Sequence, residues 1–286
     1  DRPNVNTRIF KKAESDMSYK LIALDIDGTI RSDEYPLSER TRQAVRRARE
    51  AGALITLATG RTFKSALRQS SDLDITTPIA SFQGAHVADP ISCEVLWHMP
   101  LTQEMTRIAM DALRPYGLEV MGYRDNAVFV SDVTEWTEGY GKRNAVDVKA
   151  VGDLGAYSAD SMTRLVVRGD DDAIERLEVD LKSKFDPSDL YITRSLSYFC
   201  EILHPDGGKD KALNWLCESN DIQPEETVAF GNGYNDVQML EWAGYSVAIG
   251  GAVPQVLEVA DTVAPPIEED GAAQVIEGLL DRGLIG

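Results

Sequence analysis

The chain has 286 residues, of which 29 are Lys or Arg and 47 are Asp or Glu, so its formal net charge at neutral pH is −18. With 43% hydrophobic and 27% charged residues, the composition is that of a folded protein with one large domain or two moderate ones. A surface this acidic repels nucleic-acid phosphates and anionic lipid, so we expect neither nucleic acid nor a membrane as a partner. No apolar run approaches the roughly 20 residues that span a bilayer.

Cysteine and histidine usage argues against a disulfide-stabilised protein and against a zinc protein. The three cysteines are far apart and odd in number, which disfavours a disulfide framework, and the three histidines form no HExxH motif. We therefore expect no zinc site and a cytoplasmic location. Residues 1–17 are polar and lack the apolar core of a signal peptide, so we interpret them as a disordered leader outside the fold.

The first part of the chain alternates predicted strands and helices. Apolar runs predict strands over Lys20–Ile26, Ala53–Ala58 and Pro78–Phe82. A helix that begins after Ser38 and ends at Gly52 separates the first two strands, and another helix separates the second from the third. This order predicts a parallel sheet with helices on both faces.

The middle of the chain predicts a different unit. Helices are expected over Thr102–Tyr116 and from Asp170 to about Phe185. The predicted strands are Leu118–Tyr123, Ala127–Ser131, Thr163–Arg168, Leu190–Arg194 and Tyr198–Leu203. A helix followed by two strands thus occurs twice, which predicts a small α+β unit with an antiparallel sheet. Between the second and third of these strands the polar sequence shows no regular pattern.

From Lys209 onward the first pattern returns. The predicted elements are a helix over KDKALNWLCES, a strand over Thr227–Phe230, a glycine-rich turn over Gly231–Asp236, a strand over Ser246–Ile249, a short helix and a final helix over Ala272–Arg282. The fold class that we expect is therefore α/β, with a Rossmann-like parallel-sheet core interrupted by the middle unit.

Two carboxylates follow the first predicted strand. The run Asp25-Ile26-Asp27-Gly28-Thr29 places acids at the C-terminal end of a parallel strand, where open α/β sheets bind ligands. In a regular strand both side chains would point to one face. One carboxylate could attack an electrophile while the other acts as general acid and base, and both could bind a divalent cation. The alternative is a turn capped by two solvated aspartates.

Polar residues at three other strand ends or helix starts could join this site. Thr59 offers a hydroxyl and Gly60 allows close approach of an anion, although a plain helix cap is an alternative. Lys209 combines an ammonium charge with a helix N-terminus, which suits phosphate, whereas the alternative is a solvated surface lysine. Asn232 and Asp236 offer oxygen ligands to a hard cation such as Mg²⁺, and the alternative is a glycine turn that begins the next helix.

The motifs DIDGT, LATGR, GGKDKAL and GNGYND resemble, in order and position, those of the haloacid dehalogenase superfamily phosphatases, and most closely the Cof-type subfamily of sugar-phosphate phosphatases. The tail AGYSVAIGGAVPQVLEVADTVAPPIEEDG resembles the ending of that subfamily, so the resemblance covers the chain from about Lys20 to its end. It implies a catalytic core over residues 18–88 and 204–286. An inserted α/β cap over residues 89–203 would close over the active site.

The resemblance also implies a role for each matching position. Asp25 would be the nucleophile that forms an aspartyl-phosphate, and Asp27 would protonate the leaving alcohol and then activate water. The groups that would hold the phosphoryl oxygens are the Ile26 amide, Thr59, Gly60, Lys209 and Asn235. The ligands of Mg²⁺ would be Asp25, the Asp27 carbonyl and Asn232, with Asp236 beside or behind them. Phosphoryl transfer needs in-line positioning and neutralisation of charge, which Lys209 and Mg²⁺ would supply.

Three positions depart from the subfamily pattern. Asn232 stands where Asp is usual, so we expect weaker Mg²⁺ binding, Asp210 replaces a glycine, and Gln83-Gly84-Ala85 replaces Asn-Gly-Ala. The expected function is Mg²⁺-dependent hydrolysis of a small phosphorylated metabolite, most plausibly a sugar phosphate, by a monomer or small homo-oligomer. Two alternatives are a sugar phosphomutase of the same superfamily and a catalytically weakened ligand-binding homologue.

Overall fold

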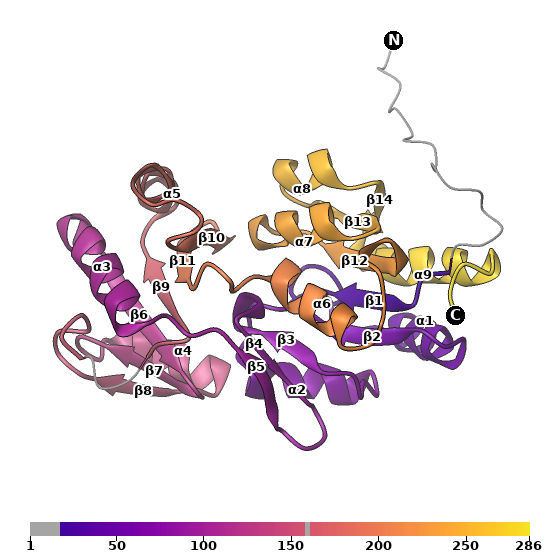
Figure 1. The fold of residues 1–286 in the computed structure, drawn as a ribbon, viewed down its shortest axis with the longest axis horizontal. Coiled ribbons are helices and arrows are strands. Elements are labelled where there is room, and N and C mark those ends of the chain that lie inside the picture. Colours follow the sequence, from indigo (N-terminus) through magenta and orange to yellow (C-terminus); the bar gives the residue numbers. More distant parts are fainter. Residues whose placement is uncertain (1–17, 158–160) are drawn as a thin grey trace, which may run out of the picture.

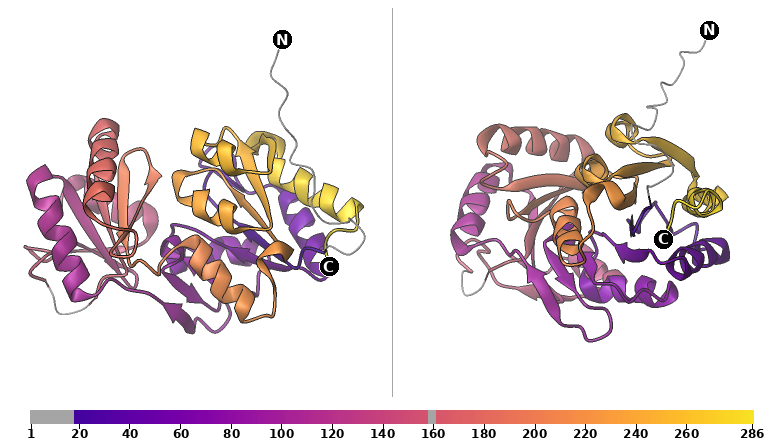
Figure 2. Two further views of the ribbon diagram at one scale, coloured as in Figure 1. Left: turned by 45° about the horizontal axis from the view of Figure 1, so that its top comes forward. Right: turned by 45° about the vertical axis from the view of Figure 1, so that its right-hand side comes forward.

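The computed structural model describes residues 18–157 and 161–286, so the expected leader over residues 1–17 lies outside the described residues. The chain forms two bodies, a core and a cap (Figure 1). The core contains the first and last described elements, and the cap is formed by the middle of the chain. The left view of Figure 2 shows the two bodies side by side.

A parallel five-stranded sheet in the order β14-β13-β12-β1-β2 forms the centre of the core. Its strands are β1 (Leu21–Leu24), β2 (Leu54–Leu57), β12 (Thr227–Gly231), β13 (Tyr245–Gly250) and β14 (Thr262–Pro266). Side chains alternate between the two faces, so Ile22 and Leu24 pack on one side and Ala23 on the other. Alanines from neighbouring strands join Ala23 and let the helices on that face pack closely.

Helices cover both faces of this sheet, as the sequence predicts. The core helices are α1 (Glu39–Glu50), α2 (Phe63–Asp72), α6 (Lys209–Glu218), α7 (Val237–Trp242), α8 (Pro254–Val259) and α9 (Gly271–Asp281). The helices α1, α2 and α9 pack against the sheet face that carries Ile22 and Leu24. The helices α6, α7 and α8 pack against the face that carries Ala23 and the neighbouring alanines. The Ser38 hydroxyl accepts a hydrogen bond from the Thr41 amide, which confirms the predicted start of α1.

A small antiparallel sheet extends the core beyond β2. It consists of β3 (Ile79–Ser81), β4 (His86–Ala88) and β5 (Val95–His98), with a 3-10 turn, η1 (Phe82–Gly84), between the first two. The expected boundary at residue 89 falls inside the β4–β5 hairpin. Because β5 pairs with β4 and β4 with β3, the chain leaves the core after His98, and we propose a cap that begins near Leu101.

The cap contains a six-stranded sheet in the order β10-β11-β9-β6-β7-β8. Its strands are β6 (Glu119–Arg124), β7 (Ala127–Val130), β8 (Asp147–Ala150), β9 (Arg164–Arg168), β10 (Tyr191–Leu196) and β11 (Phe199–Leu203). All neighbouring strands are antiparallel except β7 and β8, and the predicted β6–β7 hairpin is confirmed.

One face of the cap sheet packs against its own helices, and the other packs toward the core. The helices α3 (Gln103–Leu113) and α5 (Asp171–Lys184) cover the first face. The second face contacts Phe82 and Ala85 of the core and also α4 (Glu135–Asn144), which together with β8 fills the stretch without a predicted pattern. No helix in residues 18–157 or 161–286 has the length and apolar character that crossing a bilayer requires.

Candidate active site

The two aspartates of the DIDGT run occupy different environments at the C-terminal end of β1. Asp25 is 5% exposed, and its amide still donates to the Phe230 carbonyl at 3.1 Å. The chain then coils, because the Ile26 carbonyl accepts from the three amides that begin at Thr29. The Asp27 side chain is 54% exposed, and because β1 ends at Leu24 the two acids do not lie on a regular strand.

Lys209 lies between two buried carboxylates. Its Nζ is 2.7 Å from Oδ1 of Asp25 and 2.6 Å from Oδ1 of Asp236, and the whole residue is only 2% exposed. Lys209 is the first residue of α6, so it brings the β1 acid and the glycine-rich turn to the N-terminus of that helix. The alternative of a solvated surface lysine is therefore excluded.

The electrostatics of this triad follow from its burial. Loss of hydration raises the pKa of the Asp25 carboxyl, with the Asp236 charge acting in the same direction and Lys209 opposing it. Burial opposes the charge on Lys209, but the carboxylates of Asp236 and Asp25 outweigh it and raise the pKa of the ammonium group. With both carboxylates ionised, two acids and one base carry a net negative charge, which a bound cation would neutralise.

Unpaired backbone donors lie at the ends of β1 and β2. Within the described residues, the N–H groups of Ile26 and Gly60 donate to no other protein group. The Thr59 hydroxyl accepts from the Arg61 amide at 3.2 Å, and it is Thr62 that caps α2, so the alternative role of Thr59 as the helix cap is wrong. The result is a pair of free amides beside a buried ammonium group, an arrangement that suits a phosphoryl group.

Gly60 also leaves room for the side chain of Gln83, because a Cβ at position 60 would lie 2.5 Å from Nε2 of Gln83. Gln83 in turn accepts a hydrogen bond from Nδ2 of Asn235 at 2.8 Å. Asn235 is 9% exposed and comes from the glycine-rich turn, so the structure brings this predicted phosphate ligand to the side of the site near Gly60.

Asn232 and Asp236 of the glycine-rich turn have different surroundings. The amide oxygen of Asn232 accepts from the Thr29 hydroxyl at 2.9 Å. Asn232 also packs on Gly28, where a Cβ would lie 2.3 Å from Nδ2, and the φ of +81° at this position also requires glycine. Asp236 uses Oδ1 for Lys209, and its Oδ2 accepts from the amides of Asn232 and Gly233 at 2.9 Å each. Asp236 therefore orders the turn and the lysine.

The donor set for a metal ion is sparse. Within the described ranges, no group of three or more His, Cys, Asp or Glu side chains is placed to hold a metal. The remaining oxygen donors at this edge are the carboxylate of Asp25, the carbonyl of Asp27 and the amide oxygen of Asn232. Such a set fits Mg²⁺, which is held by one or two carboxylates and keeps several waters.

Arg61 is a site residue for which the sequence analysis assigned no role. Its Nε and Nη2 donate to the two carboxylate oxygens of Asp27 at 2.7 and 2.6 Å. This bidentate pair fixes the direction of an otherwise exposed carboxylate. The signal available in the sequence was its position, directly after Thr59 and Gly60 at the end of β2.

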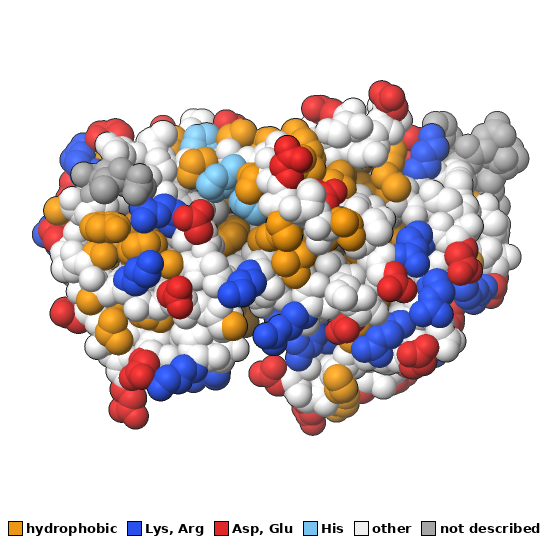
Figure 3. Space-filling view, turned by 90° about the horizontal axis from the view of Figure 1, so that it is seen from below, with side chains coloured by type: hydrophobic (Ala, Val, Ile, Leu, Met, Phe, Trp, Pro, Cys, Tyr) orange, Lys and Arg blue, Asp and Glu red, His pale blue; other side chains and the backbone are white. Residues whose placement is uncertain are grey.

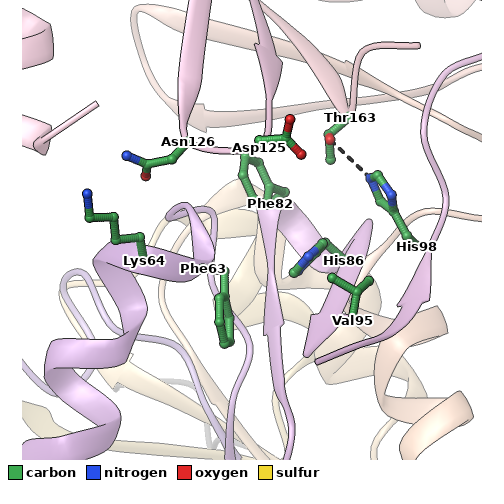
Figure 4. Close-up of a pocket in the computed structure, with 9 residues that line it drawn as sticks. All are labelled: Phe63, Lys64, Phe82, His86, Val95, His98, Asp125, Asn126 and Thr163. Atoms are coloured by element: carbon green, nitrogen blue, oxygen red, sulfur yellow. Dashed lines mark hydrogen bonds between the residues drawn. The ribbon is translucent and has the colours of Figure 1, made fainter. Parts of the chain in front are cut away.

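A cavity of about 180 Å³ lies between the core and the cap (Figure 4). Its lining residues are Phe63, Lys64, Phe82, His86, Val95, His98, Asp125, Asn126 and Thr163. His98 and Thr163 join the two bodies at its rim, with Nε2 and Oγ1 3.1 Å apart. Histidine side chains also gather where the two halves meet in the view of Figure 3.

The two histidines of this cavity are uncharged at neutral pH. Burial and the neighbouring His98 lower the pKa of His86 to about 4, and burial also lowers the pKa of His98. Their rings lie 5.4 Å apart, centre to centre. The cavity therefore presents neutral imidazoles and aromatic faces beside the charged side chains of Lys64 and Asp125. Aromatic faces suit carbon rings, and the polar groups suit hydroxyl groups.

Comparison with known proteins identifies the class to which this site belongs. The family of haloacid dehalogenase-like hydrolases matches residues 22–276, so the chain belongs to that family. The resemblance inferred from the motifs is thus confirmed, and so is the fold class of a parallel core with an inserted cap. The chain is a phosphatase of this superfamily, as the names of its relatives also indicate.

Three similar proteins illustrate the relationship. A 5-amino-6-(5-phospho-D-ribitylamino)uracil phosphatase of Bacillus subtilis is 26% identical over 260 residues, which are 90% of this chain and 96% of that protein. The phosphatase YwpJ of Bacillus subtilis is 25% identical, with 91% and 100% covered. The crystal structure of a haloacid dehalogenase-like hydrolase from Bacteroides thetaiotaomicron matches with a TM-score of 0.76 at 26% identity, covering 92% of this chain and 100% of that one.

Proposed function

We propose that this chain hydrolyses small phosphate monoesters, sugar phosphates in particular, with Mg²⁺ and through an aspartyl-phosphate on Asp25. The observation that carries this proposal is the buried ammonium group of Lys209, 2.7 Å from Asp25 and adjacent to strand ends with unpaired amides. A cation and free N–H groups around a buried carboxylate can hold a phosphoryl group beside a nucleophile.

In the first step, a carboxylate oxygen of Asp25 attacks phosphorus and the bond from phosphorus to the leaving oxygen breaks. Asp27 gives its proton to that oxygen, so the alcohol leaves neutral. In the second step, Asp27 takes a proton from water, the new hydroxide attacks phosphorus, and the bond to Asp25 breaks. Inorganic phosphate leaves and both carboxyl groups return to their starting states.

The other site residues bind and orient. The amides of Ile26 and Gly60, together with Thr59, Lys209 and Asn235, would hold the phosphoryl oxygens. Arg61 holds both oxygens of Asp27 in this structure. For the acid step it would release one of them, which takes up the proton, and by keeping the other it would direct the carboxyl toward the leaving group.

Mg²⁺, held by Asp25, the Asp27 carbonyl and Asn232, would supply positive charge to the phosphoryl oxygens. Asp236 would stand behind the cation site, because both of its oxygens are already engaged by Lys209 and the turn amides. Asn232 contributes no charge, and we therefore expect weak Mg²⁺ binding.

The cavity between core and cap is our candidate for the leaving-group subsite. Phe63 opens the helix that follows Gly60 and Arg61, and Phe82 directly precedes Gln83, so two lining residues are close in sequence to residues of the phosphate subsite. At about 180 Å³ it is smaller than the roughly 300–1,000 Å³ typical of drug-sized ligands, which favours a small leaving group. Its neutral histidines and the carboxylate of Asp125 can bind hydroxyl groups.

The experiment that tests this proposal is phosphate release from p-nitrophenyl phosphate and a panel of sugar phosphates, with and without Mg²⁺. We expect Mg²⁺-dependent release that Asp25→Asn abolishes and that Asp33→Asn, at an exposed nearby carboxylate, leaves unchanged. Isomerisation of a sugar phosphate faster than phosphate release would instead indicate the phosphomutase. Binding without turnover at any Mg²⁺ concentration would indicate the ligand-binding homologue.

A second test addresses the leaving-group subsite. Asp125→Ala should raise the KM for sugar phosphates about tenfold, the worth of one good hydrogen bond, while the inhibition constant of inorganic phosphate stays the same. Asp147→Ala, at another exposed aspartate of the cap, is the matched control. An equal change in both constants for Asp125→Ala would argue against this cavity as the leaving-group subsite.

A further inference from the structure

A buried chain of hydrogen bonds connects the phosphate subsite with the cap. Asn235 Nδ2 donates to Gln83 Oε1 at 2.8 Å, and Gln83 Nε2 donates to Glu201 Oε1 at 2.8 Å. Arg164 Nη1 donates to the other oxygen of Glu201 at 2.6 Å. All four side chains are at most 9% exposed. Asn235 and Gln83 belong to the core, whereas Glu201 on β11 and Arg164 on β9 belong to the cap.

The direction of every bond in this chain follows from one charged group. A carboxylate accepts hydrogen bonds and does not donate them, so Glu201 forces Gln83 to present its amide nitrogen to the cap. The carbonyl oxygen of Gln83 must then face the core, where it can only accept from Asn235. Asn235 therefore presents its own amide nitrogen to Gln83, and the second hydrogen on that nitrogen remains for a ligand.

The backbone at Gln83 is held in a conformation that favours this contact. Gln83 has φ 58° and ψ 28°, a left-handed conformation that is uncommon for residues other than glycine, asparagine and aspartate. Its side chain lies against Gly60, as the 2.5 Å approach to a Cβ there indicates. Such conformations persist where the surrounding contacts determine them, and here the contacts are a phosphate-subsite residue and a cap carboxylate.

We propose that Gln83 and Glu201 are positioning residues that make phosphate binding depend on the seating of the cap. With the cap seated, Glu201 orients Gln83, which orients the Asn235 amide toward the phosphoryl group. With the cap displaced, the bond between Gln83 and Glu201 is lost and the Asn235 amide can rotate. This inference rests on the proposed function, because it assumes that Asn235 contacts the phosphoryl group.

The test uses Gln83→Asn in the full chain. Asparagine tolerates the left-handed backbone, so the variant should fold, but its side chain is one methylene shorter and cannot reach both partners. We expect the inhibition constant of inorganic phosphate, and its dissociation constant by calorimetry, to rise about tenfold. KM for p-nitrophenyl phosphate should rise similarly, with a smaller change in kcat, because the contact exists in the ground state.

The control is Glu119→Gln. Glu119 pairs with Arg168 at 3.1 Å on the same cap sheet but outside this chain of bonds. The control should leave phosphate affinity unchanged. A melting temperature for each variant establishes that it is folded.

A second variant, Gln83→Glu, gives a pH signature. Its protonated carboxyl can donate to Glu201 and accept from Asn235 as the amide does, whereas its ionised form would repel Glu201. Its kcat/KM relative to the unsubstituted chain should therefore increase as the pH is lowered. A simple packing role for Gln83 would give a constant ratio.

Phosphate affinity within about twofold of the unsubstituted chain in Gln83→Asn, or a pH-independent ratio in Gln83→Glu, would overturn the inference. An equal loss of phosphate affinity in Gln83→Asn and Glu119→Gln would also overturn it, because it would reflect a general loosening of the cap. If the unsubstituted chain neither binds phosphate nor hydrolyses any ester, the proposed function itself fails and this inference with it.

Discussion

Removal of the Lys209 charge should destabilise the core far more than an ordinary surface substitution. Lys209→Met keeps the length of the side chain but leaves the carboxylates of Asp25 and Asp236, which are 5% and 1% exposed, without their cation. Breaking a buried ion pair by removing one partner costs about 3–5 kcal/mol, because the remaining charge stays buried. We expect a loss of this size in the free energy of unfolding, together with loss of phosphate release.

A double variant separates the charge effect from lost packing. Asp236→Asn removes one of the two stranded carboxylates, so Lys209→Met with Asp236→Asn should be about 1–3 kcal/mol more stable than the sum of the two single losses predicts. The assay is urea denaturation of the unsubstituted chain, the two single variants and the double variant. Their free energies of unfolding are compared provided that the four proteins share the same slope (m) of free energy against urea concentration. A loss below about 1 kcal/mol for Lys209→Met, or strict additivity in the double variant, would refute this reasoning.

Three further substitutions test other parts of the site. Asn232→Asp adds a charged oxygen ligand, so half-maximal activity should need about tenfold less Mg²⁺, measured by titrating the metal; an unchanged requirement would argue against Asn232 as a ligand. Arg61→Met frees Asp27 and should lower kcat about tenfold in steady-state assays, whereas an increase would mean that Arg61 restrains Asp27. His86 stays unprotonated in the folded chain down to about pH 4 but not in the unfolded chain, so stability falls between about pH 6.5 and 4. Between about pH 7 and 4.5 the free energy of unfolding of His86→Gln, measured by urea denaturation, should fall by about 2 kcal/mol less than that of the unsubstituted chain, after a discount for partial exposure. An equal fall in both proteins would contradict the lowered pKa of His86.

The core and the principal site residues were accessible from the sequence because parallel strands end at one edge. Apolar runs with polar residues at their C-terminal ends predict that Asp25, Thr59 and Asp236 lie near one another. The structure brings them to that edge and places the predicted Lys209 between the two acids. The exposure of Asp27 was not predictable from spacing, since it depends on where the β1 hydrogen bonds stop.

The elements that sequence patterns missed are those fixed by tertiary contacts. The helix α4 contains two glycines and has no strong apolar stripe, but Trp136 and Tyr140 pack against Phe199 of the cap sheet. Gly141 allows β8 to approach, because a Cβ there would lie 2.7 Å from Val148. The edge strand β14 ends in two prolines, which are tolerated only at such an edge and which hid it from strand patterns.

The polar chain from Arg164 to Asn235 was equally hidden. Its members lie 37 residues apart in the cap pair and 152 residues apart in the core pair. Only the strand register of the cap and the left-handed turn at Gln83 bring them together. The departure of Gln83 from the subfamily pattern was visible in the sequence, but its contacts with Glu201 and Asn235 were not.

The central claim is that Asp25 carries the phosphoryl group during turnover. We would mix the protein with an excess of substrate and Mg²⁺, quench the reaction with acid while hydrolysis proceeds, and map phosphorylated peptides by mass spectrometry. The expected result is a phosphoryl group on the peptide that contains Asp25, absent in Asp25→Asn, which should also release no phosphate. Steady phosphate release by Asp25→Asn, or a phosphoryl group trapped on another residue, would contradict the claim.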